Sequence, residues 1–406
     1  MLVVTAQGRR RSGRRTQAIP FWARFSPWTW FVVFLAVSLA KTCLWALTVW
    51  GGVPLLGWLV GPKSGNDGDY YHAYAQGLVE QATSLWPVLL RQLFEWGLYT
   101  RQGVALGNLM LGVWLVPLVA AHVAVSGVQV QRRARKKLFW FAALLFALYP
   151  APFWFTLDIY RDVFMLGTFV FGAYAVQRYF SSAGWAKAGW LFLFAALVAL
   201  LFSLRGYLGF SLGLGFSLAH LLVRTNFRRG TVFVGLFLYT LALYGAHALG
   251  LLTPIAEYRG ESGFEIGGSS FGLGIQGASG LEFFALFSLS FLYQIFGLHF
   301  HSFFAALLFL VESLPFLLFL AGVWINRLHL DTFSKFTLLF SLIYATIVVL
   351  GNDNLGTAMR LRMFVYVAVL MVWIRGQASW LAKESAHLFV KSTGSVQRPH
   401  EIGGAS

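Results

Sequence analysis

Residues 303–323 read FFAALLFLVESLPFLLFLAGV, and this run of 21 residues contains one charged side chain, Glu312. A helix needs roughly 20 mostly apolar residues to cross the hydrocarbon core of a bilayer. Three further windows of similar length and character lie at 28–50, 104–125 and 231–251. A transmembrane β-barrel would instead show short segments of alternating polarity. The sequence therefore predicts an all-α, polytopic bundle of transmembrane helices.

The composition agrees with a chain surrounded by lipid. Hydrophobic residues make up 58% of the 406 residues and charged residues 11%, and the mean hydropathy is +0.67. These values lie outside the range of soluble domains. The single cysteine, Cys43, falls inside the first apolar window. A disulfide framework and a cysteine metal site are therefore excluded.

The net charge of +16 comes from basic runs at 9–15, 132–137 and 224–229, each beside an apolar window. Because they do not form one soluble face, they do not indicate a nucleic-acid partner. Clusters of lysine and arginine mark the cytoplasmic ends of spans. The rule predicts about ten spans with both termini in the cytoplasm, near 28–50, 104–125, 138–156, 163–180, 187–203, 207–223, 231–251, 302–325, 336–351 and 363–375.

This topology divides the chain into a basic cytoplasmic N-terminus (1–27), a transmembrane domain (28–375) and a cytoplasmic tail (376–406). Two outer loops are long enough to form helical or irregular structure of their own, and loops of this kind often carry functional residues. They comprise residues 51–103 and 252–301. Within the second, 283–297 is apolar but is expected to be an interfacial or re-entrant helix, because another crossing would place the basic tail outside.

Four groups of polar residues lie on the predicted outer side. Arginine at bilayer depth costs about 3 kcal/mol on insertion scales, so it is retained where an anion or a wet cavity meets it. Its guanidinium fork binds phosphate oxygens at two points. Several arginines at one boundary therefore indicate an anion site. The groups are Asp67 and Asp69 with His72; Arg161 and Asp162, near Asp158; Arg205 with Tyr207; and Arg360 with Arg362.

Carboxylates beside such arginines suit a transfer reaction. A carboxylate can take the proton of an attacking hydroxyl group, while arginines stabilise the negative charge of a leaving phosphate. Each group also has a structural interpretation. The aspartates at 67 and 69 can be turn residues, and the arginines can pair locally or extend toward lipid headgroups. Since Arg360 and Arg362 are two positions apart on a helix, their side chains point in different directions.

At these residues the chain resembles the membrane glycosyltransferases and polymerases that act on polyprenyl-linked sugars in bacterial surface polysaccharide assembly. A first span followed by a long outer loop with Asp67 and Asp69 is similar to the GT-C class, whose catalytic carboxylate lies early in that loop. Two further stretches resemble O-antigen and exopolysaccharide polymerases: Tyr149-Pro150-Ala151-Pro152 followed by Arg161-Asp162, and Gly356-Thr357 followed by Arg360 and Arg362. Unlike GT-C enzymes, the chain has no large soluble C-terminal domain.

The resemblance implies a glycosyl transfer or polymerisation on the outer face of the bacterial cytoplasmic membrane. The donor would be a sugar or oligosaccharide on undecaprenyl pyrophosphate, with a saccharide acceptor and other polysaccharide-assembly proteins as partners. Asp67 or Asp69 would be the general base, and the arginines would bind the phosphate. No metal site is predicted, although a requirement for a divalent cation is left open. The alternative is a transporter or flippase of a lipid-linked or anionic saccharide, which would predict related halves with paired helix interruptions; the sequence has neither.

Overall fold

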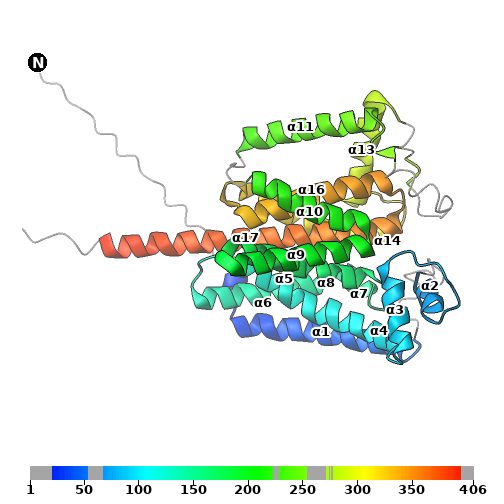
Figure 1. The fold of residues 1–406 in the computed structure, drawn as a ribbon. Coiled ribbons are helices and arrows are strands. Elements are labelled where there is room, and N and C mark those ends of the chain that lie inside the picture. Colours follow the sequence, from blue (N-terminus) through cyan, green and yellow to red (C-terminus); the bar gives the residue numbers. More distant parts are fainter. Residues whose placement is uncertain are drawn as a thin grey trace, which may run out of the picture.

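A computed structural model describes residues 21–53, 67–222, 228–253, 271–273, 275 and 278–394. Figure 1 shows that these residues form a bundle of helices. The predicted N-terminal segment 1–20, much of the second outer loop (254–270) and the end of the tail (395–406) lie outside the described residues.

The long helices are α1 (Pro27–Val49), α2 (Asp67–Ala75), α3 (Leu85–Glu95), α4 (Arg101–Leu109), α5 (Val116–Val125), α6 (Arg132–Leu148), α8 (Asp162–Ser181), α9 (Gly184–Leu204), α10 (Gly206–Leu221), α11 (Arg229–Ala248), α13 (Gly280–Gln294), α15 (Leu314–Ile325), α16 (Thr332–Gly351) and α17 (Leu355–Gly394). Shorter pieces are α7 (Pro150–Trp154), α14 (Phe303–Leu308) and two π-helical segments, Met110–Leu115 and Phe309–Ser313.

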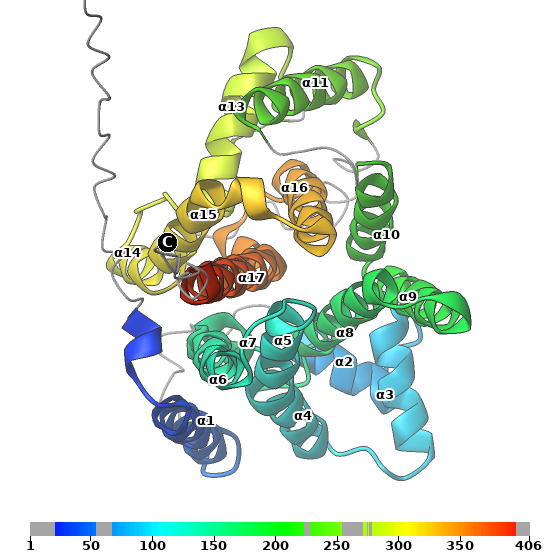
Figure 2. The same cartoon turned by 90° about the vertical axis from the view of Figure 1, so that its left-hand side faces the viewer.

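Seven helical runs among the described residues are long and apolar enough to cross a membrane. The predicted all-helical, membrane-type bundle is therefore confirmed, whereas the count of about ten spans stays a prediction. Three more helices, α6, α8 and α10, run alongside the others in both views (Figures 1 and 2). The seven candidate spans are Pro27–Val49, Arg101–Val125, Gly184–Leu204, Gly230–Ala248, Phe303–Ile325, Thr332–Gly351 and Leu355–Trp380.

Helix starts follow from local capping chemistry. The side chain of Ser26 accepts a hydrogen bond from the N–H of Thr29 at 3.1 Å, and Pro27 occupies the first turn of α1. Thr100 caps α4 by accepting from the N–H of Gly103 at 3.0 Å. Serine and threonine at this position satisfy N–H groups that the helix itself leaves unpaired. The cap at Thr100 fixes the start of α4 and therefore the position from which the side chain of Arg101 extends.

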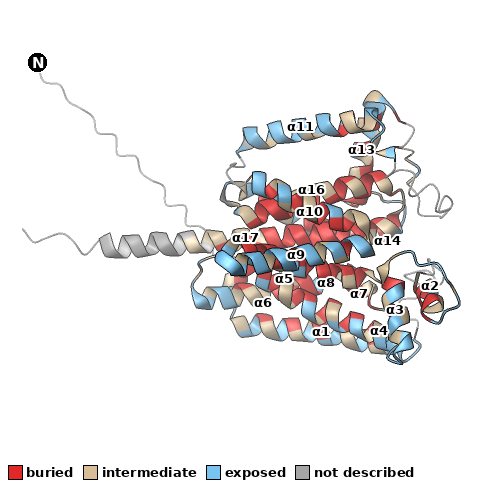
Figure 3. Cartoon of the chain, viewed as in Figure 1, coloured by how far each residue is buried: buried red, intermediate tan, exposed pale blue. Residues whose placement is uncertain are grey.

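The core lies around α16 and α17. Most residues of α16 and of the stretch of α17 up to Trp380 are buried, whereas α1, α9 and α11 expose apolar side chains over much of their length (Figure 3). Helix α17 packs against α5, α15 and α16. Exposed apolar surface on the outermost helices is expected where lipid replaces water as the solvent. The central position of α17 brings its residues into contact with several distant parts of the chain.

Three helices lie across the direction of the bundle. Helices α2 and α3 lie beside each other at the end opposite to the last turns of α17, and α13 lies at the same end on another side of the bundle (Figures 1 and 2). Helix α13 has 15 residues and is not among the candidate spans. It covers most of the segment 283–297, and the interfacial or re-entrant position expected for that segment stays a prediction. The crosswise end, called the outer end below after the sequence-based topology, carries most of the candidate residues.

Two predicted boundaries differ from the structure. The span expected at 138–156 breaks at Tyr149, where α6 has ended and Pro150 begins α7, because a residue before proline disfavours the helical conformation; Tyr149 has ψ 122°. The end expected at residue 375 is not a helix end, since α17 continues to Gly394. Residues 377–391 contain neither glycine nor proline and include alanine, leucine and lysine, which favour helix.

An acid-sensitive ion pair joins the start of α16 to α17 at the end of the bundle opposite to the outer end, called the inner end below. Nη2 of Arg375 lies 2.6 Å from Oδ2 of Asp331, and the same guanidinium donates to the carbonyl of Ser126 at 2.5 Å. Burial acts to raise the pKa of Asp331, but Arg375 and Ser334 outweigh it and hold the pKa below its usual value of 3.8.

We therefore expect this contact to stabilise the protein above pH 3.8 and to be lost as the pH falls further, through the folded-state pKa. Asp331→Asn should remove that acid-side loss and lower the stability at neutral pH by about 1–3 kcal/mol, because buried Arg375 loses its counter-charge. Thermal unfolding as a function of pH measures both effects. Glu95→Gln, in an exposed pair with Arg91, is the control; equal behaviour of the two variants would contradict the assignment.

Candidate functional site

The first turn of α2 places Asp67 and Asp69 on either side of Gly68. A Cβ atom on Gly68 would lie 2.3 Å from Oδ2 of Asp158 and 3.2 Å from Nη2 of Arg101. No side chain fits at these distances, so glycine allows α2 to approach the bundle. The positive end of the helix dipole also favours carboxylates in the first turn. Both predicted catalytic aspartates are thereby held against the outer end of the bundle.

Arg360, near the start of α17, binds one aspartate from α2 and one from α8. Its Nη1 lies 2.7 Å from Oδ2 of Asp67, and its Nη2 lies 2.6 Å from Oδ2 of Asp162. Its guanidinium also faces the rings of Phe155 and Tyr160, at 5.5 and 5.6 Å from their centroids. Charge-assisted hydrogen bonds of this length are strong, and the aromatic faces favour the cation. A single side chain thus connects α2, α8 and α17.

Arg101, the first residue of α4, forms a second junction that the sequence analysis did not single out. It binds Asp158 at two points, with Nε–Oδ1 at 2.8 Å and Nη2–Oδ2 at 2.5 Å, and Asp69 at a third, with Nη1–Oδ1 at 2.8 Å. Asp158 was noted only as a neighbour of Arg161. One signal for Arg101 was present, because it is an arginine at the outer end of a predicted span, as Arg360 is.

Arg161 and Arg205 complete the group. Arg205 separates α9 from α10, and its Nη1 lies 3.8 Å from Oδ1 of Asp162. Its guanidinium faces the ring of Tyr207 at 5.4 Å. Nη1 of Arg161 donates to the carbonyl oxygen of Leu204 at 3.0 Å. These contacts bring the two predicted phosphate-binding residues to the buried carboxylate that Arg360 also binds.

Several guanidinium N–H groups in this cluster have no acceptor. Within the described part of the chain, Nε of Arg161, Nη1 of Arg205 and Nε of Arg360 are buried and make no hydrogen bond. Oδ1 of Asp162 is likewise unpaired, since 3.8 Å to Arg205 is too long for a hydrogen bond. Buried polar groups are normally paired. The cluster therefore has donors left for a further anion.

The charges of the cluster balance. Four arginines (101, 161, 205 and 360) face four aspartates (67, 69, 158 and 162). The aspartates differ in burial: the side chain of Asp162 is fully buried and that of Asp158 is 22% exposed, against 37% for Asp67 and 61% for Asp69. An arriving anion would most easily replace the two more exposed carboxylates, both of which belong to α2.

Tyrosine and histidine side chains of α2 line the same region. Burial raises the pKa of Tyr71 to about 12, so its hydroxyl group stays protonated at neutral pH and remains a donor. The neighbouring arginines and aspartates, Arg161 and Asp67 among them, act on it electrostatically. Nδ1 of His72 lies 2.8 Å from the hydroxyl oxygen of Tyr99. His72, predicted to bind substrate, therefore contacts Tyr99 instead of an arginine or aspartate of the cluster.

Arg362 does not join this cluster. It follows Arg360 by two residues on α17, and its side chain points to another part of the bundle, where Nη2 lies 2.9 Å from Oε2 of Glu312. The pair is buried, with 1% and 0% of the two side chains exposed. The divergence expected for two residues this close on a helix explains the difference. The grouping of Arg362 with the phosphate-binding arginines is therefore corrected.

No group of three or more His, Cys, Asp or Glu side chains suited to a metal ion occurs in the described ranges. His299 and His301 do lie together, with ring centroids 4.9 Å apart. Each carboxylate of the outer cluster instead faces a guanidinium group. A divalent cation would have to compete with these arginines, and a requirement for one stays an open prediction.

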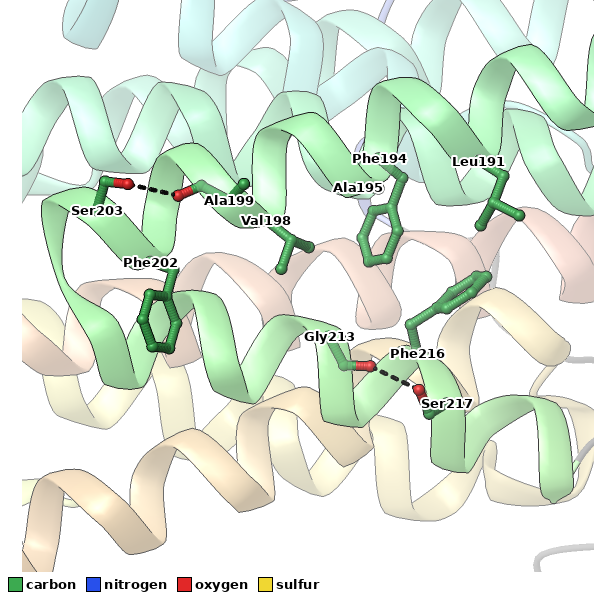
Figure 4. A pocket seen from close by; sticks show the side chains of 10 residues that line it. All are labelled: Leu191, Phe194, Ala195, Val198, Ala199, Phe202, Ser203, Gly213, Phe216 and Ser217. Carbon is green, nitrogen blue, oxygen red and sulfur yellow. Dashed lines mark hydrogen bonds between the residues drawn. The ribbon is translucent and has the colours of Figure 1, made fainter.

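A groove of about 600 Å³ runs between α9 and α10 (Figure 4). Its walls are mostly apolar, and its hydroxyl groups bind their own helices: Ser203 donates to the carbonyl of Ala199, and Ser217 to that of Gly213. The groove ends at Phe202 and Ser203, next to the Arg205 segment. The residues that line the groove include no ionisable side chain.

Gly68→Ala is expected to weaken the docking of α2, because the added methyl group meets Asp158 at 2.3 Å. Overpacking of this kind costs about 1–3 kcal/mol. Hydrogen exchange of α2 amides should quicken, while the exchange of α17 amides stays unchanged. Gly107→Ala in α4, where a Cβ has no neighbour within 4 Å, is the matched control. Unchanged protection of α2 in Gly68→Ala would contradict the close approach.

No family model, curated protein or solved structure matches this chain. What the cluster does is therefore inferred from its geometry.

Proposed function

We propose that the protein is an integral membrane glycosyltransferase or oligosaccharide polymerase that uses a sugar donor linked to polyprenyl phosphate or pyrophosphate. The reaction would take place on the outer face of the bacterial cytoplasmic membrane, in surface polysaccharide biosynthesis. The observation that carries the proposal is the outer cluster, in which three buried guanidinium groups have unpaired N–H donors beside two partly exposed carboxylates. Such a site suits a reaction in which an attacking hydroxyl group loses its proton while a phosphate leaves nearby.

In this proposal the donor phosphate binds Arg360, Arg205 and Arg161 through the N–H groups that have no acceptor. When the phosphate also takes Nη1 of Arg360, it displaces Asp67 from that atom, while Asp69 stays on Arg101 and the buried Asp162 stays in place. This exchange separates little charge, because one anion replaces another at the guanidinium group of Arg360. The carboxylates of Asp67 and Asp69 then lie on the more exposed side of the cluster, where an acceptor hydroxyl group arrives from water.

The proposed transfer step needs no change of oxidation state and no further reactant. A carboxylate of Asp67 or Asp69 accepts the proton of the acceptor hydroxyl group, and the oxygen forms a bond to the anomeric carbon of the donor sugar. The bond between that carbon and the phosphate oxygen breaks, and its electron pair remains on the phosphate. The arginines stabilise this charge as it develops. The products are the extended saccharide and the polyprenyl phosphate or pyrophosphate.

Reconstitution tests the proposal. Purified protein in liposomes, supplied with a polyprenyl-pyrophosphate-linked oligosaccharide, is expected to release polyprenyl pyrophosphate and to form a longer saccharide. High salt should raise the KM, because surface charges that attract the donor are screened. Absence of product with donors of several sugar compositions, in protein that remains folded, would overturn the enzymatic proposal.

A transporter or flippase is the second candidate, and the buried pair of Arg362 and Glu312 favours it. Ionisable side chains inside spans often mark transport pathways. The two candidates differ in where a lipid-linked precursor accumulates when the outer cluster is disabled. An enzyme leaves the precursor on the outer leaflet, whereas a flippase leaves it on the inner leaflet. Labelling of the precursor from outside the membrane distinguishes them.

A further inference from the structure

A second polar site lies inside the apolar bundle, on the side of α17 that Arg362 faces. Glu312 belongs to the π-helical segment Phe309–Ser313, within the candidate span Phe303–Ile325. Its Oε2 lies 2.9 Å from Nη2 of Arg362. π-Helical segments are rare and often occur at functional sites, and buried charges inside a membrane are costly. The proposed transfer reaction uses neither side chain.

Four polar atoms at this site have no hydrogen-bond partner among the described residues. They are Nε and Nη1 of Arg362, Oε1 of Glu312 and the hydroxyl oxygen of Tyr149. The backbone N–H of Ala151 also faces the carboxylate. An unpaired buried polar group costs about 1–3 kcal/mol. Several such groups close together indicate a polar occupant, and water is the one that can both donate to Glu312 and accept from Arg362.

Gly297 brings the outer loop after α13 against this site. It has φ +69°, and a Cβ atom there would lie 2.3 Å from Oγ of Ser313 and 2.8 Å from Nη1 of Arg362. The hydroxyl group of Tyr366 lies 3.0 Å from the same Ser313 Oγ and donates to the carbonyl of Ile295 at 2.8 Å. Polar groups thus continue from the buried pair to the loop that reaches the outer end.

We propose that this site binds water and that Glu312 exchanges a proton with the outer aqueous phase past Gly297. A hydronium ion of the outer phase gives its proton to Oε1 of Glu312 and is left as water; the reverse step returns the proton to water, and no other bond forms or breaks. The charged and titratable groups that face it are Arg362 and Tyr366 from α17 and Tyr149 from the junction of α6 and α7. Lys41 of α1 lies behind them and donates to the carbonyls of Tyr149 and Ala147, at 3.1 and 2.5 Å. The inference does not depend on glycosyl transfer.

Infrared difference spectroscopy of the full chain in lipid nanodiscs tests the proton exchange. On acidification we expect a carbonyl band of a protonated carboxyl group that shifts in D₂O. Glu312→Gln should remove this band, Glu312→Asp should move it, and Glu95→Gln on the surface should leave it in place. A band that persists in Glu312→Gln, or no band at any pH at which the protein stays folded, overturns the proposal.

The access route has its own test, which also serves if Glu312→Gln fails to fold. Gly297→Ala should slow the exchange of the band into D₂O, because the methyl group crowds Ser313 and Arg362 and leaves less room for water between them. Gly97→Ala is the matched control, since Gly97 has φ +70° and no atom within 4 Å of a Cβ. Both variants carry the same backbone strain. Equal exchange rates in the two variants would show that protons do not pass Gly297.

Discussion

Replacing Asp69 with asparagine is expected to lower the turnover of a lipid-linked donor by roughly 10²–10⁴-fold, the usual contribution of a general base, while the bundle stays folded. Asp69 is the most exposed aspartate of the cluster, and its ion-pair partner among the described residues is Arg101, at 2.8 Å. Arg101 keeps its two-point contact with Asp158 when Asp69 leaves. Asparagine preserves the shape of the side chain but cannot accept the proton at neutral pH.

The rate should be measured in proteoliposomes per amount of folded protein, with kcat and KM determined separately. We expect kcat to fall and KM to change little. Glu95→Gln, another exposed acid at the outer end, is the control and should retain full turnover. Loss of turnover in Asp67→Asn but not in Asp69→Asn would move the role of the base to Asp67. Full turnover in both would reject a catalytic aspartate in α2.

The sequence predicts this outer cluster well because of how spans alternate. Each crossing returns the chain to one of two surfaces, so the basic runs that mark the inner ends also fix which loops meet outside. Asp67 and Arg360 are 293 residues apart and still form an ion pair at 2.7 Å. The cost of arginine at bilayer depth then selects Arg161, Arg205 and Arg360 from many basic residues.

Pairing within the cluster was harder to predict. Arg101 lies at the edge of the long loop 51–103, so its role in binding Asp69 and Asp158 appears only when α2 is docked on α4. The partner of Arg362 could not be read from spacing either. Helix geometry shows that the side chains of Arg360 and Arg362 point in different directions. It does not show that the span with Glu312 packs on the side of α17 that Arg362 faces.

Helix boundaries were also predicted only in part from the sequence. Proline at 150 is a local signal that explains the break between α6 and α7, and it could have been used. The continuation of α17 to Gly394 was missed because the span was bounded by hydropathy, which marks where lipid ends and does not mark where a helix ends. Three helices, α6, α8 and α10, have the place of spans in the bundle but do not meet the length and composition of the seven candidates.

Arg360→Lys is expected to lower turnover by roughly 10²–10³-fold, the effect of removing one donor that stabilises a developing charge. The guanidinium of Arg360 contacts Asp67 and Asp162 at the same time, at 2.7 and 2.6 Å, and keeps an unpaired Nε. Lysine keeps the positive charge near buried Asp162 but offers a single, mobile ammonium group. Folding should therefore be retained better than in Arg360→Ala, where an unpaired buried charge costs about 3–5 kcal/mol.

Two comparisons separate phosphate binding from a purely structural role of Arg360. Arg91→Lys, on exposed α3 at the same end, is the control and should keep full turnover. If Arg360 stabilises the leaving phosphate, Arg360→Lys should lose more rate with a poor leaving group, a monophosphate-linked donor, than with a pyrophosphate-linked donor. A structural role predicts equal loss with both donors, together with faster hydrogen exchange in α2 and α8.

In cells, Arg360→Lys should cause the lipid-linked precursor to accumulate on the outer leaflet. Precursor retained on the inner leaflet would instead favour the flippase, because Arg360 would then act before the lipid crosses the membrane.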